Sequence, residues 1–315
     1  MKVLVTGAAG FIGTYLCRLL DQLGADVTPI DLVDCDVRDT EGLRSIIARV
    51  RPETVYHLAA IASVTESWAR PSETWSTNVL GTAALLEATR MAAPTARVLV
   101  MSTASVYDGA ALDGPVDEAR PVQAISPYGT SKAMAETLAR HYSAAYGMRV
   151  LIARPTNVIG PGQHPSYVVP ALSRRILGAR AAGLSSITSG NWDAKRDFVD
   201  VRDAVVALTR IAQLGAPGGT YNICTGVGTT IAELARQLCA LADTELTVLP
   251  DPALQRRLDA RSLVGDPTRI NREIGWQARR PLTRTLSDVL AALTAATGDG
   301  SPSGGAKALQ LDVRK

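Results

Sequence analysis

The sequence predicts an α/β protein, with a Rossmann-type doubly wound parallel sheet and a smaller C-terminal substrate-binding lobe. Short apolar runs alternate with helical patterns through the first half of the chain, as in parallel sheets covered by helices. The first apolar run, Val3–Val5, leads into three glycines, and a helical pattern follows from Phe11 to Leu23. A strand, a glycine turn and a helix form the first half of a dinucleotide-binding unit. The glycines are Gly7, Gly10 and Gly13.

The glycine turn predicts where the pyrophosphate of a dinucleotide would bind. Glycine lets the backbone turn tightly and approach a phosphate, and the positive end of the next helix attracts that anion. The spacing is Gly-x-x-Gly-x-x-Gly, and not the Gly-x-Gly-x-x-Gly of the commonest dehydrogenases. We expect Phe11 and Ile12, which open the helix, to contact the cofactor together with the three glycines.

The second predicted strand, Ala25 to Asp31, ends in an acidic residue. Asp31 lies 24 residues after the first glycine, near where a Rossmann unit places the acid that binds the adenosine ribose. A carboxylate there accepts hydrogen bonds from a 2′-hydroxyl and repels a 2′-phosphate, so we expect NAD(H) rather than NADP(H). Asp36 and Val37, in the acidic loop that follows, are expected beside the adenine. Pro29 is unusual within a strand, and the sequence does not explain it.

The remaining elements of the first half continue the alternation. We expect Leu58, Ala59 and Ala60, after the third strand, to lie under the cofactor as backbone contacts. Asn78 is either a polar surface residue or a buried asparagine that braces the cofactor loops. The predicted helices and strands are Thr40–Val50, Glu53–His57, Thr65–Met91 with a break near Pro71, Arg97–Met101, Tyr128–Tyr146 and Arg149–Arg154.

Beyond Pro155 the alternation becomes less regular, which indicates a change of domain. A loop is expected at Asn157–Gln163 and a polar, charged segment at Ser189–Asp203. Helices are predicted at about Val168–Ala182, Val201–Leu214 and Ile231–Leu241, and a strand at Thr220–Cys224. The expected division is an NAD-binding domain at 1–155, with a helix and strand near 199–224 returning to it, mainly a substrate-binding lobe at 156–297, and a flexible tail at 298–315.

Composition excludes several classes of function. The 315 residues have a net charge of +3 with both signs interspersed, and a mean hydropathy of +0.09. No basic block suggests nucleic acid, no apolar run could span a bilayer, and a strand beginning at Lys2 leaves no room for a signal peptide. The four cysteines lack the spacing of metal ligands, and the presence of only three histidines argues against a histidine-based metal site. We therefore expect a cytoplasmic protein with no metal, no nucleic-acid partner and no membrane contact.

The catalytic candidates are a tyrosine, a lysine and a threonine. Tyr128 and Lys132 are four residues apart on one predicted helix, so they share a face. A nearby ammonium favours the phenolate and lowers the pKa of a tyrosine from about 10. Thr103, at the end of a predicted strand, could hydrogen-bond the same substrate oxygen. Only five of the 33 basic residues are lysines, so a lysine four residues after a tyrosine is not expected by chance. A hydroxyl, a tyrosine and a lysine beside a nicotinamide are the groups needed for hydride transfer.

Taken together, these motifs resemble the extended short-chain dehydrogenase/reductases that act on nucleotide sugars, over residues 1 to 295. The resemblance implies that Thr103, Tyr128 and Lys132 are catalytic, with Tyr128 as the acid/base. It also implies cofactor contacts from Ser102 and Pro155. The matching residues are Gly7-x-x-Gly10-x-x-Gly13, Asp31, His57-Leu58-Ala59-Ala60, Ser102-Thr103, Pro127-Tyr128-Gly129-x-x-Lys132, Arg154-Pro155-x-Asn157 and Arg196-Asp197-Phe198.

One segment narrows the resemblance to enzymes of GDP-linked sugars. Gly190–Asp203 is similar to the matching segment of GDP-mannose 4,6-dehydratases and of reductases of GDP-4-keto-6-deoxymannose. Gly160–Gln163 and Leu263–Asp266 resemble the reductases more closely. The resemblance therefore implies a GDP-linked substrate reduced at its C4 ketone, with arginines suited to its diphosphate. The implied substrate contacts are Ser63, Thr103, Asn157, Lys195, Arg196 and Arg256.

Two other activities and a non-catalytic role stay open at this point. Dehydration needs an additional acid and base near the sugar, where this chain has Ala104 and Ser105. Those two residues are more similar to 4-epimerases, which use the same catalytic residues and retain NAD. A protein that only senses the dinucleotide would have no reason to keep all three catalytic groups. We also expect a homodimer, because helices such as Thr65–Met91 and Tyr128–Tyr146 pair into a four-helix bundle in families like this one.

Overall fold

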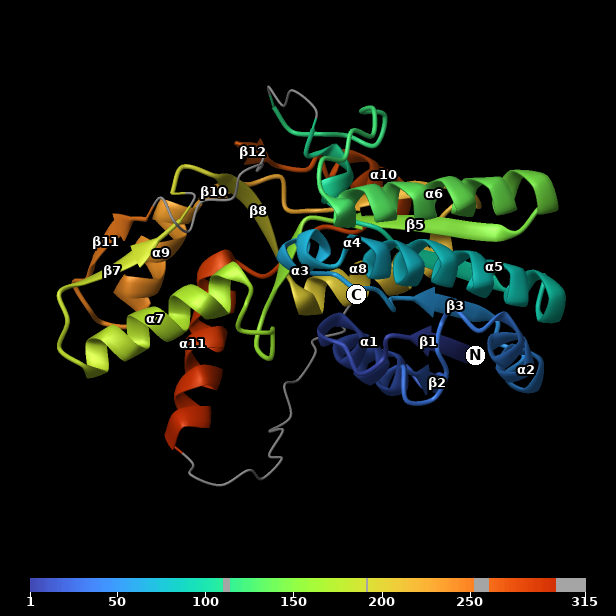
Figure 1. Cartoon of the computed structure of the whole chain (residues 1–315), viewed down its shortest axis with the longest axis horizontal. Helices are drawn as coiled ribbons and strands as arrows, with labels where there is room; N and C mark the ends of the chain where they lie inside the picture. Colours follow the sequence, from blue (N-terminus) through green and yellow to red (C-terminus); the bar gives the residue numbers. More distant parts are fainter. Residues whose placement is uncertain (110–113, 191, 252–260, 299–315) are drawn as a thin grey trace.

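The main sheet confirms the predicted α/β, Rossmann-type fold. The computed structural model describes residues 1–109, 114–190, 192–251 and 261–298 (Figure 1). The strands of the sheet are β1 (Lys2–Thr6), β2 (Asp26–Ile30), β3 (Thr54–His57), β4 (Arg97–Met101), β5 (Arg149–Pro155) and β9 (Thr220–Ile223). All are parallel, in the order β2-β1-β3-β4-β5-β9. The order changes direction beside β1, and open α/β sheets bind ligands beyond the carboxyl ends of the strands at such a point.

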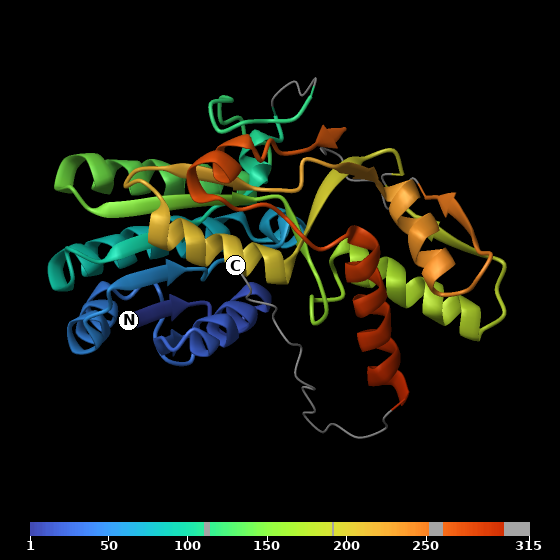
Figure 2. The same cartoon turned by 180° about the vertical axis from the view of Figure 1, so that it is seen from behind.

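Helices cover both faces of this sheet (Figures 1 and 2). Val3 and Val5 face one apolar layer, whereas Leu4, between them, faces the other, because successive strand residues point to opposite sides. The first layer is covered by α1 (Phe11–Gln22), α8 (Val201–Leu214) and α10 (Thr268–Ile274). The second is covered by α2 (Thr40–Val50), α5 (Gly81–Ala92) and α6 (Pro127–Tyr146).

The position of β2 explains its proline. β2 is an end strand of the sheet, and Pro29 lies opposite Val5 of β1. An end strand tolerates proline where the missing N–H would face away from the neighbouring strand. Pro29 therefore costs the sheet no internal hydrogen bond.

The predicted helix Thr65–Met91 consists of several pieces. Pro71 breaks it as expected, because proline fits the first turn of a new helix but not a helix interior. A π-helical turn then interrupts the helix again, and such turns are frequent at functional sites. The pieces are α3 (Val64–Ala69), α4 (Pro71–Trp75), η1 (Ser76–Leu80) and α5.

The smaller lobe has its own apolar core, formed by α7 (Val168–Ala181), α9 (Ile231–Leu241) and α11 (Leu282–Gly298). One sequence prediction is wrong here, and a second segment contains a strand that the sequence did not predict. The predicted loop Asn157–Gln163 begins with β6 (Asn157–Ile159), and the predicted polar segment Ser189–Asp203 contains β8 (Lys195–Asp200). The two strands pair with each other in parallel. The other strands of this lobe are β7 (Ser186–Ser189), β10 (Gly228–Thr230), β11 (Thr247–Pro250) and β12 (Ser262–Leu263).

The chain crosses between the lobes more than once. α8 and β9 belong to the large lobe, and α10 packs with them, although it follows most of the small lobe in sequence. The predicted tail beyond residue 298 lies outside the described residues. Within the described ranges, no helix has the length and hydropathy needed to cross a bilayer. Those ranges also contain no group of three or more His, Cys, Asp or Glu residues that could hold a metal ion.

Candidate active site

The glycine turn between β1 and α1 is closed too tightly for side chains. Gly7 has a φ of +70°, and a Cβ there would lie 2.6 Å from the Ala59 nitrogen. A Cβ on Gly13 would lie 2.2 Å from the Gly7 carbonyl oxygen. Gly10 precedes α1 without a side-chain cap, which leaves the N–H groups of the turn that begins at Phe11 without a side-chain partner. This cradle fits the diphosphate of a dinucleotide.

Asp31 lies directly after β2, beside the glycine turn. Its Oδ2 accepts a hydrogen bond from the Ala9 nitrogen at 2.9 Å, and its Oδ1 accepts one from the Leu32 nitrogen at 2.8 Å. The carboxylate is therefore held at the edge of the diphosphate cradle, where the sequence predicts the ribose acid. Asp36, in contrast, pairs with Arg38, whose hydrogen bonds lower the pKa of the Asp36 carboxyl to about 2.

The other predicted cofactor residues line the same edge of the sheet. Phe11, Ile12 and Leu58 are partly buried and pack against the core of the large lobe. Val37 is buried next to the start of α5. Pro155 is buried at the end of β5. The structure places these residues around the predicted cofactor site, and their contacts with a dinucleotide stay a prediction.

The sequence leaves two alternatives open for Asn78, and the structure shows the second one, a buried asparagine that braces the backbone. Its Oδ1 accepts a hydrogen bond from the Ile61 nitrogen at 2.8 Å. Its Nδ2 donates to the Ile61 carbonyl at 3.0 Å and to the Ser131 hydroxyl at 2.9 Å. Because Leu58, Ala59 and Ala60 lead directly to Ile61, Asn78 fixes the path of the backbone that is predicted to lie under the cofactor.

His57, at the end of β3, is a neutral structural group. Its Nδ1 lies 2.8 Å from the Thr6 hydroxyl, and its Nε2 lies 3.1 Å from the Thr82 hydroxyl. Burial, and secondarily the charge of Lys132, lowers the pKa of His57 to about 3. An uncharged imidazole therefore joins the carboxyl ends of β1 and β3 beneath the cofactor site.

Thr103, Tyr128 and Lys132 come together where β4 ends and α6 begins. Thr103 follows β4, and its Oγ1 caps the turn η2 (Ala104–Tyr107) by accepting a hydrogen bond from a backbone nitrogen at 3.1 Å. The Lys132 ammonium donates to the Met101 carbonyl, the last of β4, at 2.8 Å. A hydrogen bond with Thr103 reaches the Tyr128 phenol. The fold thus assembles the three groups from two segments, as the sequence predicts.

The charge state of these groups differs from the sequence prediction in one respect. Burial raises the pKa of Tyr128, and negative charge on Tyr167 or Asp108 raises it further, although Thr103 lowers it. The predicted lowering by the neighbouring lysine is wrong, because that ammonium turns to a backbone carbonyl and desolvation of the phenol dominates. Burial lowers the pKa of Lys132 to about 8, against the opposing charge of Glu136. At neutral pH the tyrosine is a protonated phenol, which can donate a proton.

The predicted diphosphate contacts lie on the paired strands β6 and β8. Asn157 opens β6, and its Nδ2 donates to the Asp197 carbonyl at 2.9 Å. Lys195 and Arg196 open β8, where Lys195 is exposed and Arg196 is partly buried. The pairing of the two strands brings Asn157 near Arg196. Arg256 lies outside the described residues.

Two serines that are predicted to contact the substrate or the cofactor use their hydroxyls in hydrogen bonds within the protein. Ser63 caps α3 by accepting a hydrogen bond from a backbone nitrogen at 3.2 Å. Ser102, next to Thr103, donates to the Glu136 carboxylate at 2.5 Å. Arg154 completes a buried ion pair with Glu136 through hydrogen bonds of 2.7 and 2.6 Å. Ser102 therefore anchors the catalytic segment to α6.

Sequence reasoning missed two ionisable side chains near Tyr128. Tyr167 immediately precedes α7, and Asp108 immediately follows η2. Each affects the pKa of Tyr128. Neither stands at a fixed spacing from the catalytic tyrosine, so only the folded chain brings them to it. The one available signal was the proximity of Asp108 to Thr103 in sequence.

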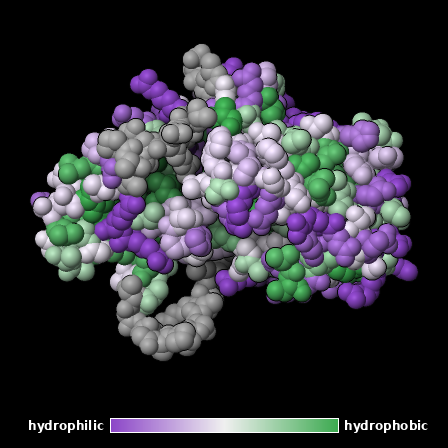
Figure 3. All heavy atoms as spheres, viewed as in Figure 1, coloured by the Kyte–Doolittle hydropathy of each residue, from purple (hydrophilic) through white to green (hydrophobic). Residues whose placement is uncertain are grey.

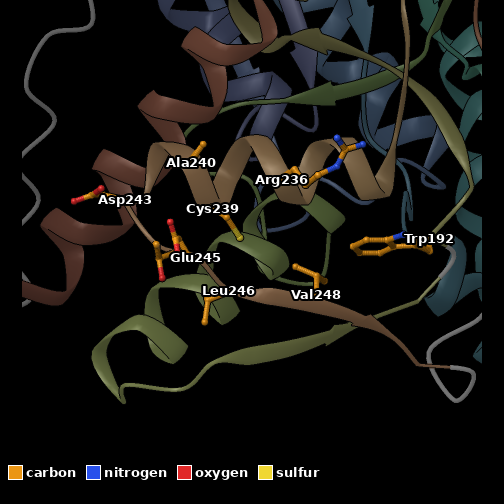
Figure 4. A pocket seen from close by; sticks show the side chains of 9 residues that line it. Trp192, Arg236, Cys239, Ala240, Asp243, Glu245, Leu246 and Val248 are labelled. Carbon is orange, nitrogen blue, oxygen red and sulfur yellow. The ribbon is translucent and has the colours of Figure 1, made fainter.

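A separate cavity of about 620 Å³ lies in the small lobe between α9 and β11 (Figure 4). The Trp192 ring and Arg236 lie at one end of it, and Asp243 and Glu245 lie at the other. None of the predicted site residues that the structure describes lines this cavity. The predicted catalytic groups therefore belong to a different part of the molecule.

Comparison with known proteins shows the family. Residues 3–224 match the NAD dependent epimerase/dehydratase family. The chain is 33% identical over 296 residues to the GDP-6-deoxy-D-mannose reductase of Pseudomonas aeruginosa, covering 92% of this chain and 96% of the relative. It is 32% identical over 311 residues to a UDP-glucose 4-epimerase of Mycolicibacterium smegmatis, covering 91% and 96%.

Solved structures agree with this assignment. The structure of RMD from Pseudomonas aeruginosa complexed with NADPH superposes with a TM-score of 0.85 at 31% identity, covering 94% of this chain and 99% of the other. The Thermus thermophilus UDP-glucose 4-epimerase complex with NAD gives a TM-score of 0.85 at 29% identity, covering 94% and 100%. We conclude that the chain is an enzyme of the NAD-dependent epimerase/dehydratase family, whose similar members are nucleotide-sugar reductases, epimerases and dehydratases.

Proposed function

We propose that this protein is a nucleotide-sugar reductase that converts the C4 ketone of a GDP-4-keto-6-deoxyhexose to an alcohol. The observation that carries the proposal is the neutral phenol of Tyr128, next to Thr103 at the carboxyl end of the sheet. A carbonyl oxygen that gains charge as hydride arrives needs a proton donor, and a neutral phenol is one. The similar GDP-6-deoxy-D-mannose reductase supports the choice of substrate class.

The three catalytic groups have separate tasks. Tyr128 donates its proton to the C4 oxygen, and Thr103 hydrogen-bonds the same oxygen as its negative charge develops. Lys132 uses one donor on the Met101 carbonyl, so two remain for the ribose hydroxyls of the dinucleotide. NADH, when bound, supplies the hydride.

We further propose that the cofactor is NAD(H) rather than NADP(H). Asp31 accepts hydrogen bonds at the edge of the diphosphate cradle, where a ribose diol could replace one of its backbone donors. Asp34 adds a second carboxylate, since its Oδ2 accepts from the Asp31 nitrogen at 2.9 Å. A 2′-phosphate at this position would meet two like charges. The similar structure that holds NADPH makes this a point to test.

The substrate diphosphate is proposed to lie between the lobes. Asn157 and Arg196 are held on adjacent strands, and Lys195 adds a second cation at the same end of β8. A planar guanidinium binds phosphate oxygens with two parallel hydrogen bonds, which suits Arg196 to this task. Arg256 and Ser63 complete the proposed set of contacts.

A 4-epimerase is the second candidate. In η2, Ala104 and Ser105 follow the catalytic threonine without a carboxylate, and a UDP-glucose 4-epimerase is among the similar proteins. An epimerase would use the same three catalytic groups and would retain its NAD through each turnover. The missing carboxylate counts against a 4,6-dehydratase, which needs an additional acid and base. A protein that only senses the dinucleotide is the most remote candidate, because the catalytic groups are assembled.

A homodimer is also proposed, through the outer face of α4, η1, α5 and α6. Trp75, Leu80, Met91 and Met134 on these helices are between 43% and 60% exposed. Figure 3 shows this side of the molecule with pale and hydrophobic residues between the charged ones. Two copies of these helices would form a four-helix bundle that covers these side chains.

The test is oxidation of NADH by purified protein supplied with GDP-4-keto-6-deoxymannose. Tyr128→Phe should bind NADH as the wild type does and lose about a hundred- to ten-thousand-fold in turnover, since it removes a proton donor used only in the transition state. Tyr146→Phe, at the exposed end of α6, is the matched control. Near-normal turnover of Tyr128→Phe would sink the assignment. Interconversion of two nucleotide sugars without net oxidation of NADH would establish the epimerase instead.

A further inference from the structure

Tyr167 lies near Tyr128, because negative charge on Tyr167 would raise the pKa of the Tyr128 phenol. It is the last residue of the segment that follows β6, and it directly precedes α7. Figure 1 shows α7 beginning at the border of the two lobes. A hydrogen bond of 3.1 Å from the Tyr167 nitrogen to the His164 carbonyl fixes its backbone. The residue is thus held at the boundary between the lobes, where the substrate diphosphate is proposed to lie.

The segment that carries Tyr167 is anchored to the cofactor helix at its other end. The Tyr15 hydroxyl, on α1, donates to the Pro161 carbonyl at 2.9 Å. A Cβ on Gly160 would lie 2.7 Å from the Val201 side chain of α8 and in ordinary contact, at 3.6 Å, with the Phe11 ring. The segment from Gly160 to Tyr167 therefore runs from the cofactor helix to the start of the small-lobe helix.

The Tyr167 hydroxyl is unpartnered among the residues that the structure describes. Within the described part of the chain it makes no hydrogen bond, and it is not among the buried polar atoms that lack a partner. Solvent therefore reaches the hydroxyl, although the ring is partly buried. The ring is thus held by packing while the hydroxyl stays available to a ligand, near the Tyr128 phenol whose pKa it affects. Burial raises the pKa of Tyr167, so the phenol keeps its proton.

We propose that Tyr167 is a substrate-binding residue that hydrogen-bonds the C3 hydroxyl of the hexose. The inference rests on the proposed reductase function. Thr103 and Tyr128 already serve the C4 oxygen, and C5 carries a methyl group and the ring oxygen. The neighbouring group that can exchange a hydrogen bond with a neutral phenol is the hydroxyl on C3.

This contact would fix which face of C4 meets the hydride. A hexose held at its diphosphate alone can rotate about the bonds to phosphorus, and a 4-epimerase depends on such a rotation to present both faces. A hydrogen bond from Tyr167 to the C3 hydroxyl would oppose this rotation of the hexose. Tyr167 therefore favours a reductase that forms one C4 stereoisomer.

A double-difference experiment tests the contact. Wild-type protein and Tyr167→Phe are each assayed with GDP-4-keto-6-deoxymannose and with its 3-deoxy analogue. Losing the phenol should lower kcat/KM about three- to tenfold on the first substrate and leave it unchanged on the analogue, because one neutral hydrogen bond is removed only where C3 bears a hydroxyl. NADH affinity should stay at the wild-type value. Tyr146→Phe, distant from the site, controls for loss of a phenol elsewhere.

Other outcomes overturn the proposal in distinguishable ways. An equal loss on both substrates would place Tyr167 at C4 as an acid, and no loss on either would remove it from the sugar site. If the wild type reduces neither substrate, the reductase function fails, and binding of GDP-mannose and GDP-3-deoxymannose to both proteins then tests Tyr167 alone. Equal affinities of wild type and Tyr167→Phe for GDP-mannose in that assay would reject the contact.

Discussion

The protonation state of Lys132 is predicted to set a pH limit on the proposed reaction. Burial lowers the pKa of Lys132 to about 8, while Glu136, one turn along α6, opposes the shift. His57, which also faces Lys132, is neutral across this range. The ammonium is present below pH 8, so kcat/KM should fall as the pH rises through about 8. Glu136→Gln should move this fall to lower pH, because it removes the charge that favours the ammonium.

The measurement is a pH profile of kcat/KM for both proteins, with thermal unfolding to confirm that Glu136→Gln is folded. Superimposable profiles would show that Lys132 does not control the alkaline limb. Tyr128 is not expected to appear below pH 10, because its pKa is raised.

Asp31 is predicted to decide between the two dinucleotides. Replacing it by asparagine removes a charged acceptor for the ribose diol, and hydrogen bonds to charged groups are worth about 1.5–3 kcal/mol. Asp31→Asn should therefore weaken NADH binding about tenfold or more and reduce the difference in affinity between NADH and NADPH. Fluorescence titration with both cofactors measures it. Asp26→Asn, at the other end of β2, controls for the change in net charge, and an equal effect of both variants would exclude a direct contact.

For single residues, the sequence predicts which side chains form the candidate site better than it predicts how those side chains interact. Thr103, Tyr128 and Lys132 follow from residue type and local spacing, and the fold brings them together. The direction of the Tyr128 pKa shift cannot be predicted from local spacing, because it depends on burial and on where the Lys132 ammonium points. Tyr167 affects the pKa of Tyr128 although the two residues are far apart in sequence, so only the folded chain reveals it.

At the scale of elements, the face of α6 and its neighbours carries a prediction about assembly. Met134 on α6 is 49% exposed, and a shallow hollow beside it is lined by Val122, Ala133 and Thr137. A charge placed there would be buried in a four-helix interface, so Met134→Glu should convert a dimer into a monomer in light scattering. Val227→Glu, at a residue 64% exposed in the segment between β9 and β10, is the control. A wild type that is monomeric at working concentration would refute the dimer.

The elements of the large lobe are predictable because each buries an apolar pattern of its own. The Val3–Val5 strand and the Phe11–Gln22 helix are examples. β8 is different, since its sequence KRDFVD opens with charged residues and gains its strand geometry by pairing with β6, 38 residues earlier at its start. A short stretch of sequence does not reveal a pairing partner of this kind, because strand formation depends strongly on tertiary context.

At the scale of the whole molecule, a buried ionic cluster fastens the lobes together. Arg202, at the start of α8 in the large lobe, binds Asp200 through hydrogen bonds of 2.8 and 2.6 Å. The same guanidinium contacts Asp288 of α11, in the small lobe, at 2.8 Å. Thr285 of α11 donates to Asp200 at 2.7 Å. Because the proposed substrate contacts come from both lobes, this cluster holds the two halves of the site in register.

Breaking the cluster should therefore affect stability and substrate binding together. Arg202→Met leaves Asp200 buried without its cation, and removing one partner of a buried ion pair costs about 3–5 kcal/mol of unfolding free energy. Arg284→Gln removes the other arginine on Asp288, but that side chain is 71% exposed, so its loss should cost less than about 1 kcal/mol. Urea unfolding compares the two variants. KM for the keto-sugar should rise in Arg202→Met while NADH affinity changes little, because the cofactor cradle lies wholly in the large lobe. Equal stability losses in the two variants, or an unchanged KM in Arg202→Met, would mean that the cluster does not set the geometry between the lobes.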